Sequence, residues 1–169
     1  MCLKIFRIIC VLISLAIMIS IFSFSTQEAS ESANTSKEFI SKIAKTFTKD
    51  FETLPIEKQE EIISNYQFLT RKTAHFSLFL TLGFFVLLSV ITYEKIKFKV
   101  RIFISFIIST IYAASDEIHQ LFVAGRSGEV RDFFIDVCGC VLGIVIGIIV
   151  YKLFLKIKGR NSYVKKEIG

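Results

Sequence analysis

Four apolar runs of about twenty residues each constrain this chain more than any other feature. The runs cover residues 5–24, 74–93, 102–122 and 133–155. A helix rises about 1.5 Å per residue, so about twenty residues cross a hydrocarbon core of roughly 30 Å. Backbone groups inside that core find no water, and helices satisfy them internally. We therefore expect an all-α membrane protein with four transmembrane helices, in which residues 1–169 form a single membrane domain.

The first run also allows a second interpretation, as a secretory signal peptide. Lys4 and Arg7 precede its apolar core, and the Ser-Phe-Ser sequence of residues 23–25 offers a small-x-small cleavage pattern. The run is long for a signal peptide, and the cleavage pattern is poor. We expect an uncleaved span, and the other three helices keep the same orientation in either case.

Lysine and arginine distribution predicts the orientation of the bundle. With the amino terminus inside, the cytoplasmic pieces carry twelve basic residues against two acidic ones. The external pieces carry nine basic residues against thirteen acidic ones. Because cytoplasmic loops carry the excess of Lys and Arg, both termini are expected in the cytoplasm of a bacterial plasma membrane protein. The net charge of +6 is thus an orientation signal, and no aromatic-basic pattern indicates a nucleic-acid partner.

Residues 25–73 form the one sizeable segment outside the spans, and we expect them to be extracytoplasmic, helical and amphipathic. Residues 35–38 (Thr-Ser-Lys-Glu) fit a capping box, and apolar residues recur at helical spacing from Phe39 to Phe51. A second helix is expected to start at Pro55, a favoured first-turn residue. The segment is too short to bury a core of its own, so we expect it on the bilayer surface or capping the bundle. A solvated linker and a lid over an external site both remain open.

Polar residues gather at the predicted outer ends of the spans, where they share one membrane level. Asp116, His119 and Gln120 stand at i, i+3 and i+4 on one helix face. Asp136 shares a stripe with the glycines at 139, 143 and 147, a small-residue face that lets a neighbouring helix approach closely. The catalytic candidates are His75, Asp116, Glu117, His119 and Asp136, and the binding candidates are Arg71, Lys72, Gln120, Arg126 and Asp132.

Several chemistries fit this set, and the residues alone do not choose among them. Ionisable residues inside a membrane are costly and mark functional sites by default. Imidazole with carboxylates suits a divalent metal such as zinc or manganese, a general acid/base pair or a proton relay. No metal ligand set is assigned, because residues 116–120 (Asp-Glu-Ile-His-Gln) depart from the H-E-x-x-H pattern of zinc proteases. The basic residues suit a phosphate or carboxylate headgroup. Alternatively, the charges only anchor helix ends or fix packing register.

In these motifs the chain resembles the VanZ-like family of small membrane proteins. The resemblance rests on "FSFSTQ", "RKTAHF" and "SDEIHQLFVAGRSGEVRDFFIDVCGCVLG", and it covers nearly the whole chain. The chain departs from the family pattern at Leu78 and Phe79, where polar residues are common, and at Ala124, where a proline is common. The family implies a link to antibiotic resistance, namely lowered sensitivity to teicoplanin-type glycopeptides.

Two functions from different classes follow. The first is a cell-envelope protein whose outward polar pocket engages a cell-wall or lipid-linked headgroup, such as a lipid-linked cell-wall precursor or a glycopeptide. The alternative is a membrane-embedded, metal-assisted hydrolase or transferase that acts on an outer-leaflet headgroup. Whether the chain is an enzyme, and in what oligomeric state it exists, stays open. The lipid bilayer itself is the partner that the apolar spans require.

Overall fold

The structure is a computed structural model that describes residues 2–26, 39–48, 50–93, 95–124 and 128–168, with side chains as far as residue 159. Its helices are α1 (Cys2–Thr26), α3 (Ile56–Ile91), α4 (Phe98–Gln120) and α5 (Val130–Ile168). A short helix over residues 39–47 and a 3-10 turn, η1 (Phe51–Thr53), lie between α1 and α3. The predicted capping box falls outside the described residues.

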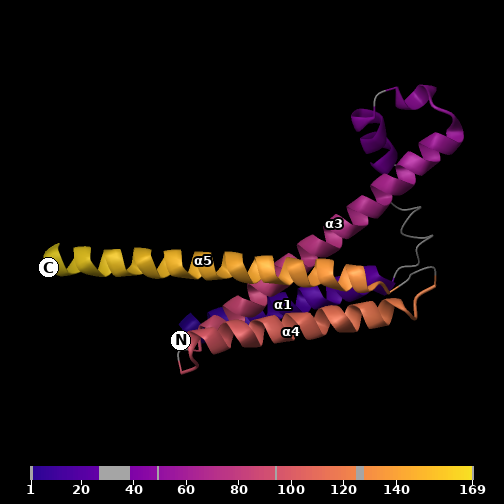
Figure 1. The fold of residues 1–169 in the computed structure, drawn as a ribbon. Coiled ribbons are helices and arrows are strands. Elements are labelled where there is room, and N and C mark those ends of the chain that lie inside the picture. Colours follow the sequence, from indigo (N-terminus) through magenta and orange to yellow (C-terminus); the bar gives the residue numbers. More distant parts are fainter. Residues whose placement is uncertain (1, 27–38, 49, 94, 125–127, 169) are drawn as a thin grey trace.

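Four of these helices are long and apolar enough to cross a membrane, which confirms the predicted all-α, four-span fold. The candidate spans are Leu3–Thr26, Ile56–Ile91, Phe98–Gln120 and Val130–Gly159. Figure 1 shows α1, α4 and α5 running in roughly the same direction and α3 crossing them obliquely. Both α3 and α4 pack against α1 and against α5. Many large apolar side chains on α1 and α5 are exposed, as expected for surfaces that face lipid.

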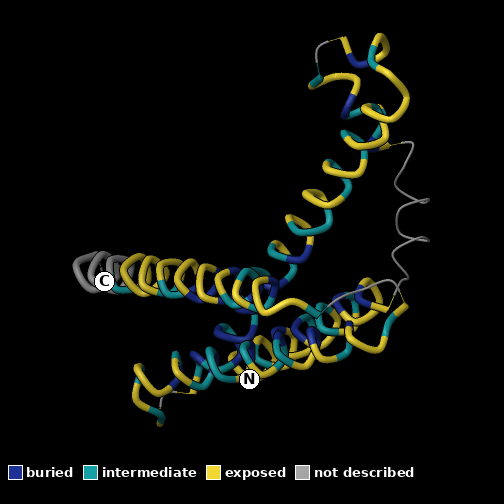
Figure 2. Tube along the Cα trace, turned by 45° about the vertical axis from the view of Figure 1, so that its right-hand side comes forward, coloured by how far each residue is buried: buried dark blue, intermediate teal, exposed yellow. Residues whose placement is uncertain are grey.

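The first half of α3 differs from the separate surface helix expected after Pro55. Residues 56–91 form one continuous helix whose N-terminal half projects beyond the bundle (Figure 1). No glycine or proline occurs between Pro55 and Gly83, so nothing in the sequence breaks the helix where the apolar run begins. The helix of residues 39–47 folds back beside this projection, which is mostly exposed or half-buried (Figure 2). Of its expected apolar face, Ile40 and Ala44 are buried.

Glycines bring α3 and α5 into backbone contact along the centre of the bundle. A Cβ added at Gly139 would lie 2.7 Å from the carbonyl oxygen of Phe76, and one at Gly143 would collide with the carbonyl of Leu80. Gly83 lies in the same way against the backbone of Cys140. The small-residue stripe on α5 is therefore an intrachain packing face. It fixes the depth of α5 against α3 and places Asp136 level with the first buried turn of α3.

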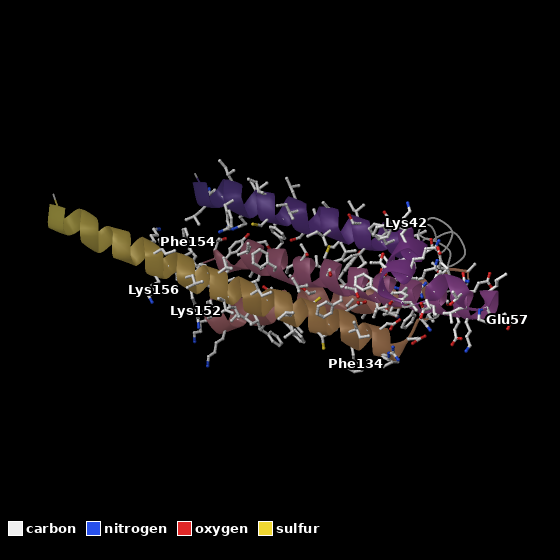
Figure 3. The ribbon with its side chains drawn as sticks, turned by 90° about the horizontal axis from the view of Figure 1, so that it is seen from above. Lys42, Glu57, Phe134, Lys152, Phe154 and Lys156 are labelled. Carbon is white, nitrogen blue, oxygen red and sulfur yellow. The ribbon has the colours of Figure 1, made fainter. Side chains whose placement is uncertain are left out.

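Contacts at the start and the middle of α1 pack this helix into the bundle. At one end, Arg7 Nε donates to Thr92 Oγ1 (3.0 Å), and the guanidinium stacks on Tyr93. Midway, Tyr112 Oη donates to the carbonyl oxygen of Met18 (2.6 Å). Figure 3 shows the two ends of the molecule: Lys152 and Lys156 lie along the far part of α5, whereas Lys42 and Glu57 lie at the opposite end.

Candidate functional site

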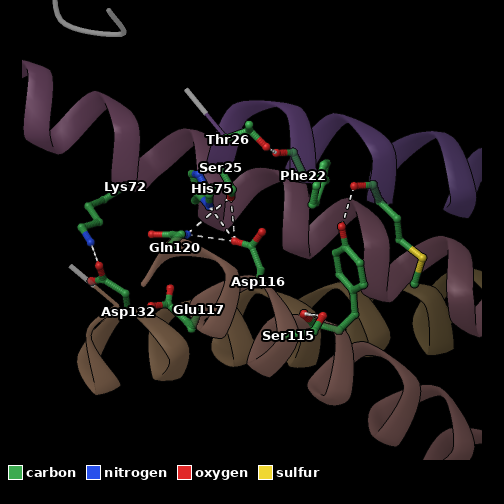
Figure 4. A network of polar contacts seen from close by, with 12 residues as sticks. Phe22, Ser25, Thr26, Lys72, His75, Ser115, Asp116, Glu117, Gln120 and Asp132 are labelled. Carbon is green, nitrogen blue, oxygen red and sulfur yellow. Dashed lines mark hydrogen bonds and ion pairs between the residues drawn. The ribbon is translucent and has the colours of Figure 1, made fainter. Parts of the chain in front are cut away.

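Asp116 of α4 is the centre of a buried polar network at the end of the bundle where α1 ends. Its Oδ2 atom accepts hydrogen bonds from Ser25 Oγ (2.8 Å) and from Gln120 Nε2 (2.9 Å). Gln120 Nε2 also lies 3.4 Å from Ser25 Oγ, which closes a triangle between α1 and α4 (Figure 4). The three side chains are buried. Gln120 sits one helical turn after Asp116, so the i, i+4 spacing of the sequence provides this pair directly.

His75 of α3 and Asp136 of α5 join Asp116 to form a three-helix cluster. His75 Nδ1 lies 4.0 Å from Asp116 Oδ2. One ligand-type atom from each of the three residues falls within 4.8 Å of the other two. All three side chains are buried. The glycine packing of α5 on α3 is what brings Asp136 to this depth.

A small pocket lies against this cluster, with basic side chains at its more exposed edge. Its lining residues are Arg71, Lys72, His75, Glu117, Gln120, Asp132, Ile135 and Asp136. The free volume is about 20 Å³, which holds about one water molecule or ion. Arg71 and Lys72 are half-buried, whereas the acidic lining residues are buried.

The two basic residues at the pocket differ in their partners. Lys72 Nζ forms an ion pair with Asp132 Oδ2 across α3 and α5 (Figure 4). Arg71 forms no ion pair with any residue that the structure describes. A partly exposed guanidinium without a carboxylate partner is a donor set for an anion, because its fork matches phosphate and carboxylate oxygens.

Glu117 faces the pocket and also holds the turn before α5. Its Oε2 atom accepts a hydrogen bond from the backbone N–H of Glu129 (3.1 Å). Gly128, the residue before Glu129, also lies against the Glu117 backbone: a Cβ added there would be 2.7 Å from the carbonyl oxygen of Glu117. This carboxylate therefore ties the α4–α5 connection to the pocket wall.

The structure separates His119 from the other candidates. Its ring stacks on Phe22 of α1, with 4.5 Å between ring centroids, and its Nε2 atom lies 3.2 Å from Thr26 Oγ1. The three residues at i, i+3 and i+4 on α4 therefore do not form one site. His119 contacts one side of α1, through Phe22 and Thr26, whereas Asp116 and Gln120 contact Ser25. Arg126 lies outside the described residues.

Ser25 is the network member that the pattern of ionisable residues does not predict. A serine at the end of an apolar helix is ordinary, and three other serines in α1 bond only to carbonyls of their own helix. The available signal was its position at the same membrane level as Asp116, within the "FSFSTQ" motif.

Comparison with known proteins identifies the family of the chain. No curated protein and no solved structure matches the chain. The VanZ/LLP1 family model matches residues 10–154, a range that begins within α1, extends past the glycine stripe of α5 and includes every residue of the pocket. The chain is therefore a multi-span membrane protein of the VanZ/LLP1 family.

Proposed function

We propose that the protein binds the anionic headgroup of a lipid-linked cell-envelope molecule at the mouth of this pocket. The observation that carries the proposal is Arg71, a half-buried guanidinium that lines the pocket and has no ion-pair partner in the described structure. Lys72 lies beside it and is already paired with Asp132. An incoming phosphate or carboxylate gives Arg71 a bidentate partner, which none of the described residues provides.

The distribution of Lys and Arg supports an outward-facing pocket. With both termini in the cytoplasm, the ends of α1 and α4 and the start of α5 face the extracytoplasmic side. The pocket then opens at the headgroup level of the outer leaflet. Ile135 forms an apolar wall of the pocket, and Phe134 beside it is exposed to lipid. These two side chains provide a surface for the hydrocarbon chain of the bound lipid.

The resemblance to VanZ-like proteins connects this binding with glycopeptide sensitivity. A protein that engages lipid-linked cell-wall intermediates changes how many of them are accessible to a teicoplanin-type drug. We propose lowered teicoplanin sensitivity as the cellular consequence of an occupied pocket.

Native mass spectrometry of the purified chain tests the binding directly, with a polyisoprenyl phosphate as the added ligand. Arg71→Gln removes the charge-assisted contact, and we expect a loss of about 1.5 kcal/mol, or roughly tenfold in affinity. Arg131→Gln is the matched control, because Arg131 is exposed on α5 and does not line the pocket. Equal retention of the ligand by both variants would overturn the proposal. Teicoplanin susceptibility of cells that express the same two variants tests the cellular consequence.

A further inference from the structure

We propose that His75, Asp116 and Asp136 form a binding site for one divalent transition-metal ion of the zinc or manganese type. The site lies beneath the headgroup mouth of the same pocket. It goes beyond the proposed function, and it does not require a bound headgroup.

The first support is the geometry of the three side chains. They come from α3, α4 and α5, and their ligand-type atoms lie within 4.8 Å of one another. Tetrahedral zinc holds nitrogen and carboxylate ligands at about 2.0–2.2 Å, so two of its ligands lie roughly 3.3–3.6 Å apart. The 4.0 Å between His75 Nδ1 and Asp116 Oδ2 exceeds this separation by about 0.5 Å, a difference that a small side-chain rotation closes when the ion binds. One imidazole with two carboxylates suits zinc or manganese better than the all-oxygen sites that calcium and magnesium prefer.

Asp136 supplies an independent observation that points to a ligand. Its side chain is 3% exposed and lines the pocket. Among the described residues, it has neither a hydrogen-bond partner nor an ion-pair partner. A carboxylate at this depth is costly unless a cation or donor compensates it. A metal ion held between His75, Asp116 and Asp136, at the wall of the pocket that His75 and Asp136 line, provides that compensation.

The charge balance of the pocket gives a third support. Around it, the described residues include four carboxylates, Asp116, Glu117, Asp132 and Asp136, against two basic side chains. The basic side chains are Arg71 and Lys72. The formal excess is two negative charges, which one divalent ion neutralises.

The neighbours of Asp116 complete the site. Ser25 and Gln120 donate to its Oδ2 atom and fix the carboxylate in the orientation that faces His75. Hydrogen bonds of this kind orient metal ligands, and their removal costs about 10–100-fold in metal affinity.

The test measures metal content of the full chain in detergent, after chelation and dialysis against Zn²⁺, Mn²⁺ or Mg²⁺ alone. We expect about one Zn²⁺ or Mn²⁺ per chain in the unmodified protein, by mass spectrometric elemental analysis. His75→Gln and Asp136→Asn should lose the ion. His119→Gln is the matched control, because this histidine stacks on Phe22 away from the cluster and should leave the ion bound.

Folding is controlled by circular dichroism and gel filtration. Asp136→Asn removes a buried charge and is expected to fold, so loss of metal from this variant reports on ligation. Ser25→Ala should retain the site with about 10–100-fold weaker binding. No stoichiometric ion in the unmodified chain, or equal metal content in His75→Gln and His119→Gln, would refute the proposal. Arg71→Gln should keep the metal, so failure of the metal site and failure of headgroup binding are distinguishable.

Discussion

Replacing Ser25 with alanine tests whether the polar network holds α1 in the bundle. Ser25 is fully buried, and its hydroxyl donates to Asp116 Oδ2 at 2.8 Å. Alanine removes the donor without adding volume. Asp116 Oδ2 then keeps its hydrogen bond from Gln120, with His75 Nδ1 4.0 Å away. Its other oxygen, Oδ1, has no hydrogen-bond partner among the described residues.

Two sets of measured hydrogen-bond energies bound the loss of free energy of unfolding expected for Ser25→Ala. A hydrogen bond to a charged group contributes about 1.5–3 kcal/mol in soluble proteins. Between transmembrane helices the average is about 0.6 and the maximum about 1.7 kcal/mol, because the unfolded chain in the membrane also finds partners. Asp116 is both acidic and buried, so we expect the upper end of the membrane scale, about 1.5 kcal/mol.

Reversible unfolding in mixed micelles of dodecylmaltoside and SDS, followed by circular dichroism, measures this free energy. Ser23→Ala is the matched control. Ser23 is exposed, and its hydroxyl bonds only to the carbonyl of Ile19 in its own helix. Its loss should change the free energy of unfolding by less than about 0.5 kcal/mol.

A double-mutant cycle assigns the effect to the contact with Asp116. In an Asp116→Asn background, Ser25→Ala should cost distinctly less than in the native chain, because the charged acceptor is gone. The reasoning fails if Ser25→Ala costs no more than Ser23→Ala, or if its cost is unchanged in the Asp116→Asn background.

Three further predictions follow from the packing and the topology. Gly143→Ala should destabilise the chain by about 1–3 kcal/mol in the same unfolding assay, because its Cβ meets the Leu80 carbonyl; Gly159→Ala, with nothing nearby, should not. The mature protein should keep α1, so an intact mass lacking residues 1–25 would contradict its packed position. In a cysteine-free background, an impermeant maleimide added to whole cells should label Glu129→Cys and spare Lys97→Cys, and the reverse pattern would invert the proposed topology.

Hydrophobic length was sufficient to predict the four helices, because crossing a bilayer is a requirement on length and composition. It did not predict the continuity of α3, whose charged first turns resemble a surface segment. Continuity there depends on the absence of a glycine or proline before Gly83. A hydropathy pattern does not register whether a helix-breaking residue is present.

The depth of the site in the membrane could be predicted from the sequence, but the contacts among its residues could not. Charge bias and helical spacing placed His75, Asp116 and Asp136 at one depth. Which of them meet depends on how far each helix is rotated, and that follows from long-range packing such as Gly139 against Phe76. The same packing explains why His119, despite its i+3 spacing from Asp116, lies on Phe22 instead.

Photocrosslinking at two adjacent positions is the most direct test of whether this pocket binds an anionic headgroup in the membrane. A diazirine amino acid at Ile135 probes the pocket wall, and the same amino acid at Phe134 probes the exposed neighbouring surface. Adducts from cell membranes are identified by mass spectrometry. We expect one class of phosphate- or carboxylate-headed lipid to be enriched at position 135, while adducts at position 134 follow the bulk lipid composition. The same lipid profile at both positions would contradict it.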